Sequence, residues 1–152
     1  MKTKILSTEE FQAHLTNSKI NVTYFQTNAG KLKVSYTQLG IFKSEFEDND
    51  QIENFENCDF INEKLLILVG TEFQIKVWKE TLKIAKGTLS SYSEIAIEIE
   101  HPKAHRAVAN ALANNNIAYF IPCHRVSAKN QKLCGYKWGI EKKIALIDSE
   151  KI

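Results

Sequence analysis

Hydrophobic and polar positions alternate along the first third of the chain. Residues 22–26 and 32–36 show this alternation and flank the sequence TNAG, which predicts a β-hairpin with Gly30 at a positive φ. Residues 41–46 predict a third strand. The acidic stretch that follows, over residues 45–60, is typical of a loop or a poorly ordered linker. The amino-terminal part is therefore expected to be rich in strands.

A helical period replaces this alternation after residue 70. Apolar residues recur at helical spacing over residues 72–87, where Gly87 is the expected stop, and over residues 101–115, where Pro102 suits the first helical position. Residues 140–150 predict a last helix. The positions expected to face the core are Phe73, Val77, Trp78, Leu82, Ala85, Ala104, Ala107, Val108, Ala111, Leu112, Ile140, Ile144 and Ile147.

Two further helix starts are marked by the spacing of a capping box. Ser7 and Glu10 have this spacing near the amino terminus, and Ser91 and Glu94 have it in the second half. The helix that starts at Ser91 is joined by the sequence EHP to the helix over residues 101–115, and the pair resembles a helix-turn-helix.

The second helix of this pair has a narrow, alanine-rich surface that carries His105, Arg106 and Asn110. Small side chains let a helix approach a nucleic-acid groove closely, and Arg106 would project from this surface. An ordinary surface arginine on two packed helices is the alternative. The pattern permits DNA binding without establishing it.

The length of 152 residues fits one large domain or two small ones. The change of pattern predicts an α+β fold. A small, strand-rich α/β domain over residues 1–69 is expected to precede a mostly helical domain over residues 70–152, which contains the helix-turn-helix.

Charge differs between the two halves although the net charge is only +2. Residues 1–70 carry seven lysines and ten acidic residues, whereas residues 71–152 carry 13 basic and eight acidic residues. The basic half is compatible with a nucleic-acid partner. We expect no membrane association, because no apolar run approaches 18 residues, and no secretory signal. Three cysteines without CxxC pairing argue against a disulfide framework and favour the cytoplasm.

Reactive residue types are concentrated in the sequence FIPCHRV, residues 120–126. Free cysteine is usually buried and inert, so a buried thiol at the end of a strand is the simplest interpretation. A cysteine beside an imidazole is also what chemistry at sulphur needs, because the thiolate is the nucleophile and a free thiol is only a few per cent ionised at neutral pH. These residues alone leave both interpretations open.

The order of the motifs resembles one family, the O6-alkylguanine-DNA alkyltransferases, also called methylated-DNA–protein-cysteine methyltransferases. The matching sequences run across roughly residues 70–150 and are GTEFQIKVW, GTLSSYSEIA, HPKAHRAVANALANN, IPCHRV, GYKWG and KKIALIDSE. The amino-terminal part matches only loosely, through TNAGKLKVSYTQLGI. Cys134 stands where this family usually has glycine, and Asn116 stands where proline is common.

The resemblance implies a catalytic set. Cys123 is expected to accept the alkyl group from O6 of a damaged guanine. His124 would remove the thiol proton through a water molecule, and Glu150 would orient His124. Tyr136 would donate a hydrogen bond that helps the guanine to leave. We expect the neighbouring imidazole to favour a thiolate at Cys123.

The resemblance also implies a DNA-binding set. Tyr92 would press on the phosphate 3′ of the target and promote its rotation, and Arg106 would fill the space left by the flipped base. Asn115 would be the hinge between the helix-turn-helix and the active-site segment. The DNA would be gripped through its minor groove. The complete expected set is Tyr92, Arg106, Ala107, Asn110 and Arg125.

The expected function is DNA repair by irreversible transfer of an alkyl group from O6-alkylguanine, and from O4-alkylthymine, in duplex DNA to the protein's own thiol. A thioether has no good leaving group, so each chain would act once. We expect no cofactor, and no metal because His14 and Cys58 lack the spacing of a metal site. The expected form is a monomer with double-stranded DNA as its partner.

Three other functions are possible from the sequence. A non-catalytic protein that binds alkylated DNA typically has tryptophan at the cysteine position, whereas this chain has Cys123. A cysteine hydrolase would pair Cys123 with His124, but adjacent residues on extended backbone point to opposite sides and no oxyanion motif is evident. A DNA-binding regulator with a buried thiol would transfer nothing.

Overall fold

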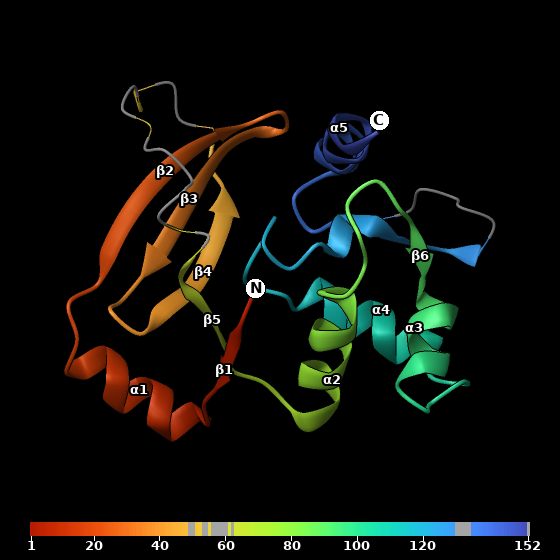
Figure 1. The fold of residues 1–152 in the computed structure, drawn as a ribbon, viewed down its shortest axis with the longest axis horizontal. Coiled ribbons are helices and arrows are strands. Elements are labelled where there is room, and N and C mark those ends of the chain that lie inside the picture. The colour runs from red at the N-terminus through yellow and green to blue at the C-terminus, as the bar shows by residue number, and fades with distance from the viewer. Residues whose placement is uncertain (49–50, 53–54, 56–60, 62, 130–134, 152) are drawn as a thin grey trace.

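A mixed sheet and a group of helices form two sides of the molecule (Figure 1). The computed structural model describes residues 1–152 except 49–50, 53–54, 56–60, 62, 130–134 and 152. The elements are β1 (Thr3–Ile5), α1 (Thr8–Thr16), β2 (Asn21–Thr27), β3 (Gly30–Tyr36), β4 (Gly40–Phe46), β5 (Leu65–Leu68), α2 (Glu72–Thr81), β6 (Ser90–Ser91), α3 (Tyr92–Glu98), α4 (His105–Ala113), the 3₁₀ helix η2 (Cys123–Arg125), β7 (Val126–Ser127) and α5 (Ile140–Glu150). The expected α+β class is confirmed.

The three predicted strands are confirmed as β2, β3 and β4, which pair antiparallel. Thr27 pairs with Gly30, so two residues connect β2 to β3, and Gly30 has a φ of 125°. The alternation has the expected cause, because Phe25, Leu32 and Val34 are buried on one face of the hairpin.

Two short strands, β1 and β5, complete the sheet and were not predicted. The strand order is β1-β5-β4-β3-β2, and β5 pairs in parallel with both β1 and β4. The approach of β4 to β5 is close enough that a Cβ on Gly40 would overlap the carbonyl oxygen of Leu65. Such short strands show too little alternation to be recognised, and their partners are distant in sequence.

Both capping predictions are confirmed at the helix starts. The Ser7 hydroxyl accepts a hydrogen bond from the backbone N–H of Glu10 (3.1 Å) at the start of α1. Ser91 and Glu94 form a complete capping box at the start of α3. Among the described residues, no helix has the length and apolar character that crossing a membrane requires.

The predicted extent of two helices is wrong. Helix α2 ends at Thr81, well before Gly87, and the carbonyl of Ile84 accepts a hydrogen bond from Arg125 Nη1 (2.8 Å) where a longer helix would have continued. Helix α4 begins only at His105, and Pro102 lies in the turn before it.

The turn before α4 is set by the end of α3. Glu100 has a φ of 64°, and the N–H of His101 donates to the carbonyl of Ala96 (2.8 Å). This is the bonding of a Schellman motif, which ends a helix and redirects the chain. Helices α3 and α4 therefore have the connection expected of a helix-turn-helix.

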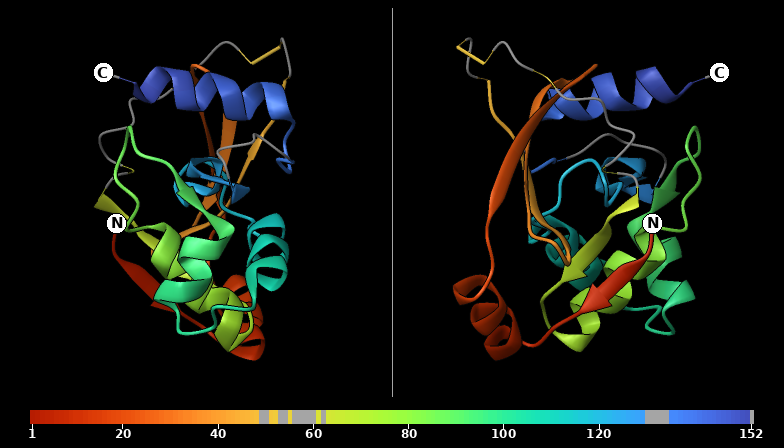
Figure 2. Two further views of the ribbon diagram at one scale, coloured as in Figure 1. Left: turned by 90° about the vertical axis from the view of Figure 1, so that its right-hand side faces the viewer. Right: turned by 60° about the vertical axis from the view of Figure 1, so that its left-hand side comes forward.

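The inner face of α5 also differs from the prediction. Ile147 is buried, but Ile140 and Ile144 are 37% and 39% exposed. The buried face instead carries Lys143 and Glu150, because both side chains bond to the segment that contains η2. Figure 2 shows α5 running across one end of the molecule.

One hydrophobic core joins the sheet to the helices, with buried side chains from β2 to β5 and from α2 to α4. Backbone bonds reinforce this contact: Ser44 N donates to the carbonyl of Asn116 (2.9 Å), and Ala118 N donates to the carbonyl of Ser44 (3.1 Å). The sheet thus directly supports the chain that leads to Cys123. The division into domains 1–69 and 70–152 stays a prediction.

Candidate active site

Cys123 begins η2, one turn of 3₁₀ helix at the end of an irregular segment that follows α4. The N–H of Cys123 donates to the carbonyl of Ile121 (2.7 Å), and the N–H of Arg125 donates to the carbonyl of Pro122 (2.9 Å). The next two residues form β7, which pairs with β6, the strand that directly precedes α3. The turn replaces the extended backbone that we considered for this segment, and both Cys123 and His124 are buried.

Asn115 connects the end of α4 to the thiol. Its N–H donates to the carbonyl of Leu112 (3.1 Å), and its Oδ1 accepts from the N–H of Ile117 (2.8 Å). Its Nδ2 lies 3.4 Å from Cys123 Sγ and 3.3 Å from the carbonyl oxygen of Ile117. The residue proposed as a hinge is therefore a buried link between the helix-turn-helix and the sulphur.

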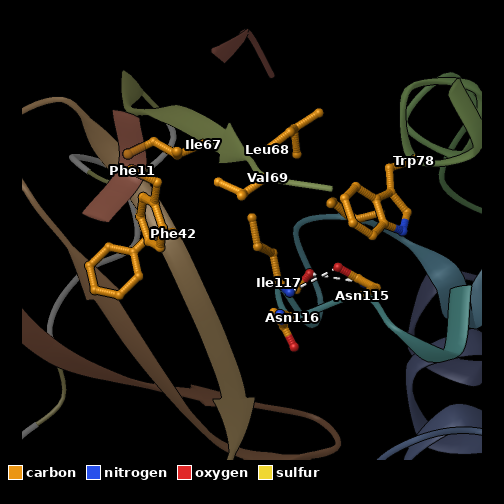
Figure 3. Close-up of a pocket in the computed structure, with 10 residues that line it drawn as sticks. Phe11, Phe42, Ile67, Leu68, Val69, Trp78, Asn115, Asn116 and Ile117 are labelled. Carbon is orange, nitrogen blue, oxygen red and sulfur yellow. Dashed lines mark hydrogen bonds between the residues drawn. The ribbon is translucent and has the colours of Figure 1, made fainter. Parts of the chain in front are cut away.

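A small cavity lies on the other side of this link, between the sheet and α2 (Figure 3). Phe42 lies at one end and Trp78 at the other, with Ile117 between them. Its volume is about 60 Å³. Cys123 does not line this cavity, which is therefore separate from the reacting site.

The environment of the thiol differs from the expected one. Burial raises the pKa of Cys123, and this outweighs the Asn115 hydrogen bond and the charge of Lys143, which both lower it. The prediction of a favoured thiolate is wrong for the resting protein, in which the thiol keeps its proton at neutral pH. Burial also lowers the pKa of His124, so the imidazole is neutral. The thiol proton of Cys123 must therefore pass to another group before the sulphur can act as a nucleophile.

Glu150 binds the Nε2 side of the His124 ring. His124 Nε2 donates to Glu150 Oε1 (2.9 Å), and Arg125 Nε and Nη2 donate to the two carboxylate oxygens at 2.8 Å each. Burial alone would raise the pKa of Glu150, but the bonds from Arg125 and His124 lower it to about 2. The buried Nδ1 of His124 has no hydrogen-bond partner within the described part of the chain. His124 is thus a neutral base with one available acceptor nitrogen.

Arg125, expected to contact DNA, directs its side-chain hydrogen bonds inward. Besides Glu150, its guanidinium binds the carbonyl of Ile84. These contacts support the carboxylate, so we separate Arg125 from the other expected DNA-binding residues. No sequence spacing distinguishes an arginine of this kind from one that faces DNA.

Lys143 is a site residue that the sequence analysis missed. Its side chain is fully buried, and Nζ donates to the carbonyl of Val126 (2.7 Å). Its charge lowers the pKa of both Cys123 and His124. A lysine two turns from Glu150 on the same predicted helix could have indicated this face, but the apolar pattern suggested another one.

A pocket opens onto the thiol of Cys123. Its volume is about 320 Å³, which is within the range of sites that hold small organic molecules. A flipped base needs such a site. The pocket is lined by Tyr92, Ala109, Asn110, Leu112, Ala113, Cys123, Gly135, Tyr136 and Lys137.

Tyr136 lies beside the sulphur at one wall of this pocket. Burial raises the pKa of its phenol far above the ordinary value, and the neighbouring Cys123 adds to the rise. The hydroxyl oxygen is buried without a hydrogen bond of ordinary geometry to the described residues. The neutral phenol of Tyr136 can thus donate a hydrogen bond to a molecule at the end of the pocket.

The outer face of α4 presents Arg106, Ala107 and Asn110 to solvent, next to the pocket mouth. Ala107 was also expected in the apolar stripe, and that expectation is wrong because Ala107 is exposed, whereas Val108, Ala111 and Leu112 of the same stripe are buried as predicted. An exposed alanine next to Arg106 leaves this surface open to a close-packed partner.

No group of three or more His, Cys, Asp or Glu side chains that could hold a metal occurs in the described ranges. His14 lies 2.7 Å from the hydroxyl of Thr37, measured from its Nε2. Cys58 and Cys134 lie outside the described residues.

A helix-turn-helix beside a base-sized pocket that ends on a buried thiol defines a class of DNA-binding proteins with chemistry at sulphur. The sequence model of the family described as "6-O-methylguanine DNA methyltransferase, DNA binding domain" matches residues 72–152. The chain belongs to this family.

Known relatives agree with this membership. A protein of Acanthamoeba polyphaga mimivirus described as a probable methylated-DNA–protein-cysteine methyltransferase is 40% identical over 146 residues, which cover 87% of this chain and 97% of that protein. A methylated-DNA–protein-cysteine methyltransferase of Kluyveromyces lactis is 49% identical over 90 residues, which cover 59% of this chain and 48% of that protein. The crystal structure of Mycobacterium tuberculosis OGT in complex with DNA matches with a TM-score of 0.71 and 31% identity, over 86% of this chain and 92% of that chain.

Proposed function

We propose that this protein repairs DNA by transferring an alkyl group from O6-alkylguanine, and from O4-alkylthymine, to the thiol of Cys123, once per chain. One observation carries the proposal: the buried sulphur of Cys123 ends a base-sized pocket, with a neutral imidazole behind it and a neutral phenol beside it. The names of the mimiviral and fungal relatives support the reaction. The protein acts as a monomer in the cytoplasm.

The reaction starts from the neutral thiol. The proton of Cys123 passes through a water molecule to His124, and the imidazolium is stabilised by Glu150 at 2.9 Å. The sulphur attacks the alkyl carbon, a carbon–sulphur bond forms, and the carbon–oxygen bond breaks with its electron pair left on O6. The proton returns from His124 to the departing guanine, so the products are a thioether and an unmodified base.

Tyr136 and Lys143 lower the cost of separating these charges. The phenol donates a hydrogen bond to the guanine ring, which becomes electron-rich as the carbon–oxygen bond breaks. The cation of Lys143 stabilises the negative charge that develops on Cys123. Asn115 donates to the same sulphur and holds it at the end of the pocket.

The target base reaches the pocket only after it leaves the duplex, which costs a few kcal/mol. Arg106 on the exposed face of α4 enters the duplex and occupies the vacated space, while Tyr92 at the pocket mouth faces the rotating nucleotide. Ala107 and Asn110 permit close approach to the minor groove. The basic charge of residues 71–152 makes binding weaken steeply with salt.

The decisive test is the fate of Cys123. Incubation with excess duplex DNA that contains O6-methylguanine should add one methyl group, about 14 mass units by its formula, to each chain, and product should stop at one per protein. Peptide mapping should place the methyl on Cys123. The variant Cys123→Ala should still bind the damaged duplex and transfer nothing. Repeated turnover, or transfer by the variant, would contradict the proposal, and binding without transfer by the wild type would favour a non-catalytic binder.

A further inference from the structure

The segment around Tyr136 has no regular secondary structure to fix it. Gly135 and Gly139 have φ angles of 39° and 103°, and the single backbone bond within this stretch joins Gly139 N to the carbonyl of Tyr136 (2.9 Å). The Tyr136 hydroxyl itself makes no ordinary hydrogen bond to the described residues. The Tyr136 ring packs against the hydrophobic core, and the residues next to it in the chain make further contacts that can fix its orientation beside Cys123.

The first such contact is made by Lys137. Its Nζ donates to the carbonyl of Asn115 (3.2 Å) and to Oδ1 of Asn116 (3.1 Å). Asn115 is the residue whose Nδ2 also lies against Cys123 Sγ. Lys137 thus ties the Tyr136 segment to the same short stretch that holds the sulphur.

The second contact is made by Trp138. Its ring lies 5.3 Å from the ring of Tyr136 and 6.3 Å from that of Phe46, in edge-to-face arrangements of 66° and 71°. Phe46 is the last residue of β4, and Lys142 Nζ lies 5.3 Å above its ring while pairing with Asp48. A row of three aromatic rings, those of Phe46, Trp138 and Tyr136, thus connects the amino-terminal sheet to the catalytic pocket.

We propose that Lys137 and Trp138 are positioning residues, which hold the Tyr136 phenol beside Cys123 by tying its segment to Asn116 on one side and to Phe46 of the sheet on the other. The inference rests on the proposed function, because it assigns a role in the same reaction. Neither residue needs to touch the reacting atoms. Each restricts the phenol to the orientation in which it can donate to a departing guanine.

The amino-terminal sheet consequently takes part in the reaction at a distance. It fixes one end of the row of aromatic rings through Phe46, and the N–H of Ser44 also donates to the carbonyl of Asn116. Both anchor points of the Tyr136 segment therefore lie on, or are bonded to, strand β4.

The test measures the rate of methyl transfer within a pre-formed complex at saturating DNA, so that weaker binding does not enter. Lys137→Met should slow this rate about fivefold, as expected from the loss of two partly exposed hydrogen bonds whose net contributions are small. Trp138→Leu should slow it by about three- to tenfold, as expected from two lost aromatic contacts. Lys137→Arg, which keeps a donor, should retain most of the rate. Lys129→Met removes an exposed lysine elsewhere and should change it less than twofold.

The same substitutions are then repeated in the Tyr136→Phe background. If Lys137 and Trp138 act through the phenol hydroxyl, each should have little further effect there, because the group that they position is gone. Losses that multiply with that of Tyr136→Phe would overturn the proposal, as would full activity of both single variants. Asn116→Ala removes one of the two Lys137 bonds and should slow the rate less than Lys137→Met does, whereas Asn116→Asp should keep the wild-type rate.

Failure of the proposed function gives a different result, because the wild type itself would then transfer no methyl group. Misfolding is recognised by the loss of a cooperative unfolding transition and of duplex binding, both of which a variant that only misplaces the phenol retains.

Discussion

The carboxylate of Glu150 is the group whose removal tests the active-site chemistry most directly. Glu150→Gln keeps the size and shape of the side chain and removes its charge. The wild-type carboxylate accepts three hydrogen bonds, from His124 Nε2 and from Arg125 Nε and Nη2, at 2.8–2.9 Å. An amide offers one acceptor oxygen and places an NH₂ group against donors, so the three bonds cannot all form.

The expected cost to stability follows from this geometry. Losing one or two charge-assisted bonds around a largely buried carboxylate, and leaving the Arg125 guanidinium short of its partner, should lower the free energy of unfolding by about 2–4 kcal/mol. The loss should itself depend on pH. The pKa of Glu150 is about 2 in the folded protein, which is below the ordinary pKa of a glutamate side chain. The contribution of Glu150 to the stability of the fold is therefore complete at pH values above that ordinary pKa, and it disappears as the pH falls toward 2. Wild type and variant should therefore become more alike in acid.

The rate should fall as well, because the imidazolium that forms on His124 loses its counter-charge. Loss of one charge-assisted hydrogen bond to the imidazolium should slow transfer about 10- to 100-fold. Glu150 raises the pKa of His124 against the effect of burial, so the variant should have a lower His124 pKa. The acid limb of the rate profile, where His124 becomes protonated, should therefore move to lower pH.

The assay is single-turnover transfer of a labelled methyl group at saturating DNA across pH, combined with urea unfolding at each pH. Asp148→Asn is the matched control, because Asp148 lies on the same helix in an exposed pair with Lys151 (2.9 Å). The control should change neither the rate nor the profile. An acid limb that stays in place or moves to higher pH in Glu150→Gln would refute the role of the carboxylate.

Three further substitutions test other parts of the structure. Lys143→Met should slow transfer and move the pH midpoint of Cys123 alkylation by iodoacetamide upward, because the cation lowers the pKa of that thiol; an unchanged midpoint would exclude the electrostatic role. Arg106→Ala should slow transfer from duplex DNA by at least about tenfold while leaving transfer from free O6-alkylguanine base intact, because only the duplex requires flipping; equal losses on both substrates would show that Arg106 acts elsewhere. Glu100→Gly should raise the free energy of unfolding by about 0.5–1 kcal/mol, since glycine relieves the positive φ of 64° that ends α3; a lower urea midpoint would contradict this.

Local signals in the sequence determined a large part of this protein. The hairpin closed at Gly30 and the capping box of Ser91 and Glu94 depend on residues a few positions apart, so their geometry follows from neighbouring side chains and backbone preferences. The motif that contains Cys123 placed the chain in its family for a similar reason, because chemistry at sulphur needs a fixed local order of residues.

Only the tertiary structure decided the electrostatic state of the site. Burial cannot be recognised from the neighbouring residues in the sequence. It raises the pKa of Cys123 and lowers that of His124, so a neutral thiol and a neutral imidazole replace the expected thiolate. The same holds for α5, where an apolar pattern pointed to Ile140 and Ile144, whereas a bond to the carbonyl of Val126 in β7 holds Lys143 inward. Contacts between distant segments set desolvation and long-range charge, and these quantities depend on the packed fold rather than on local order.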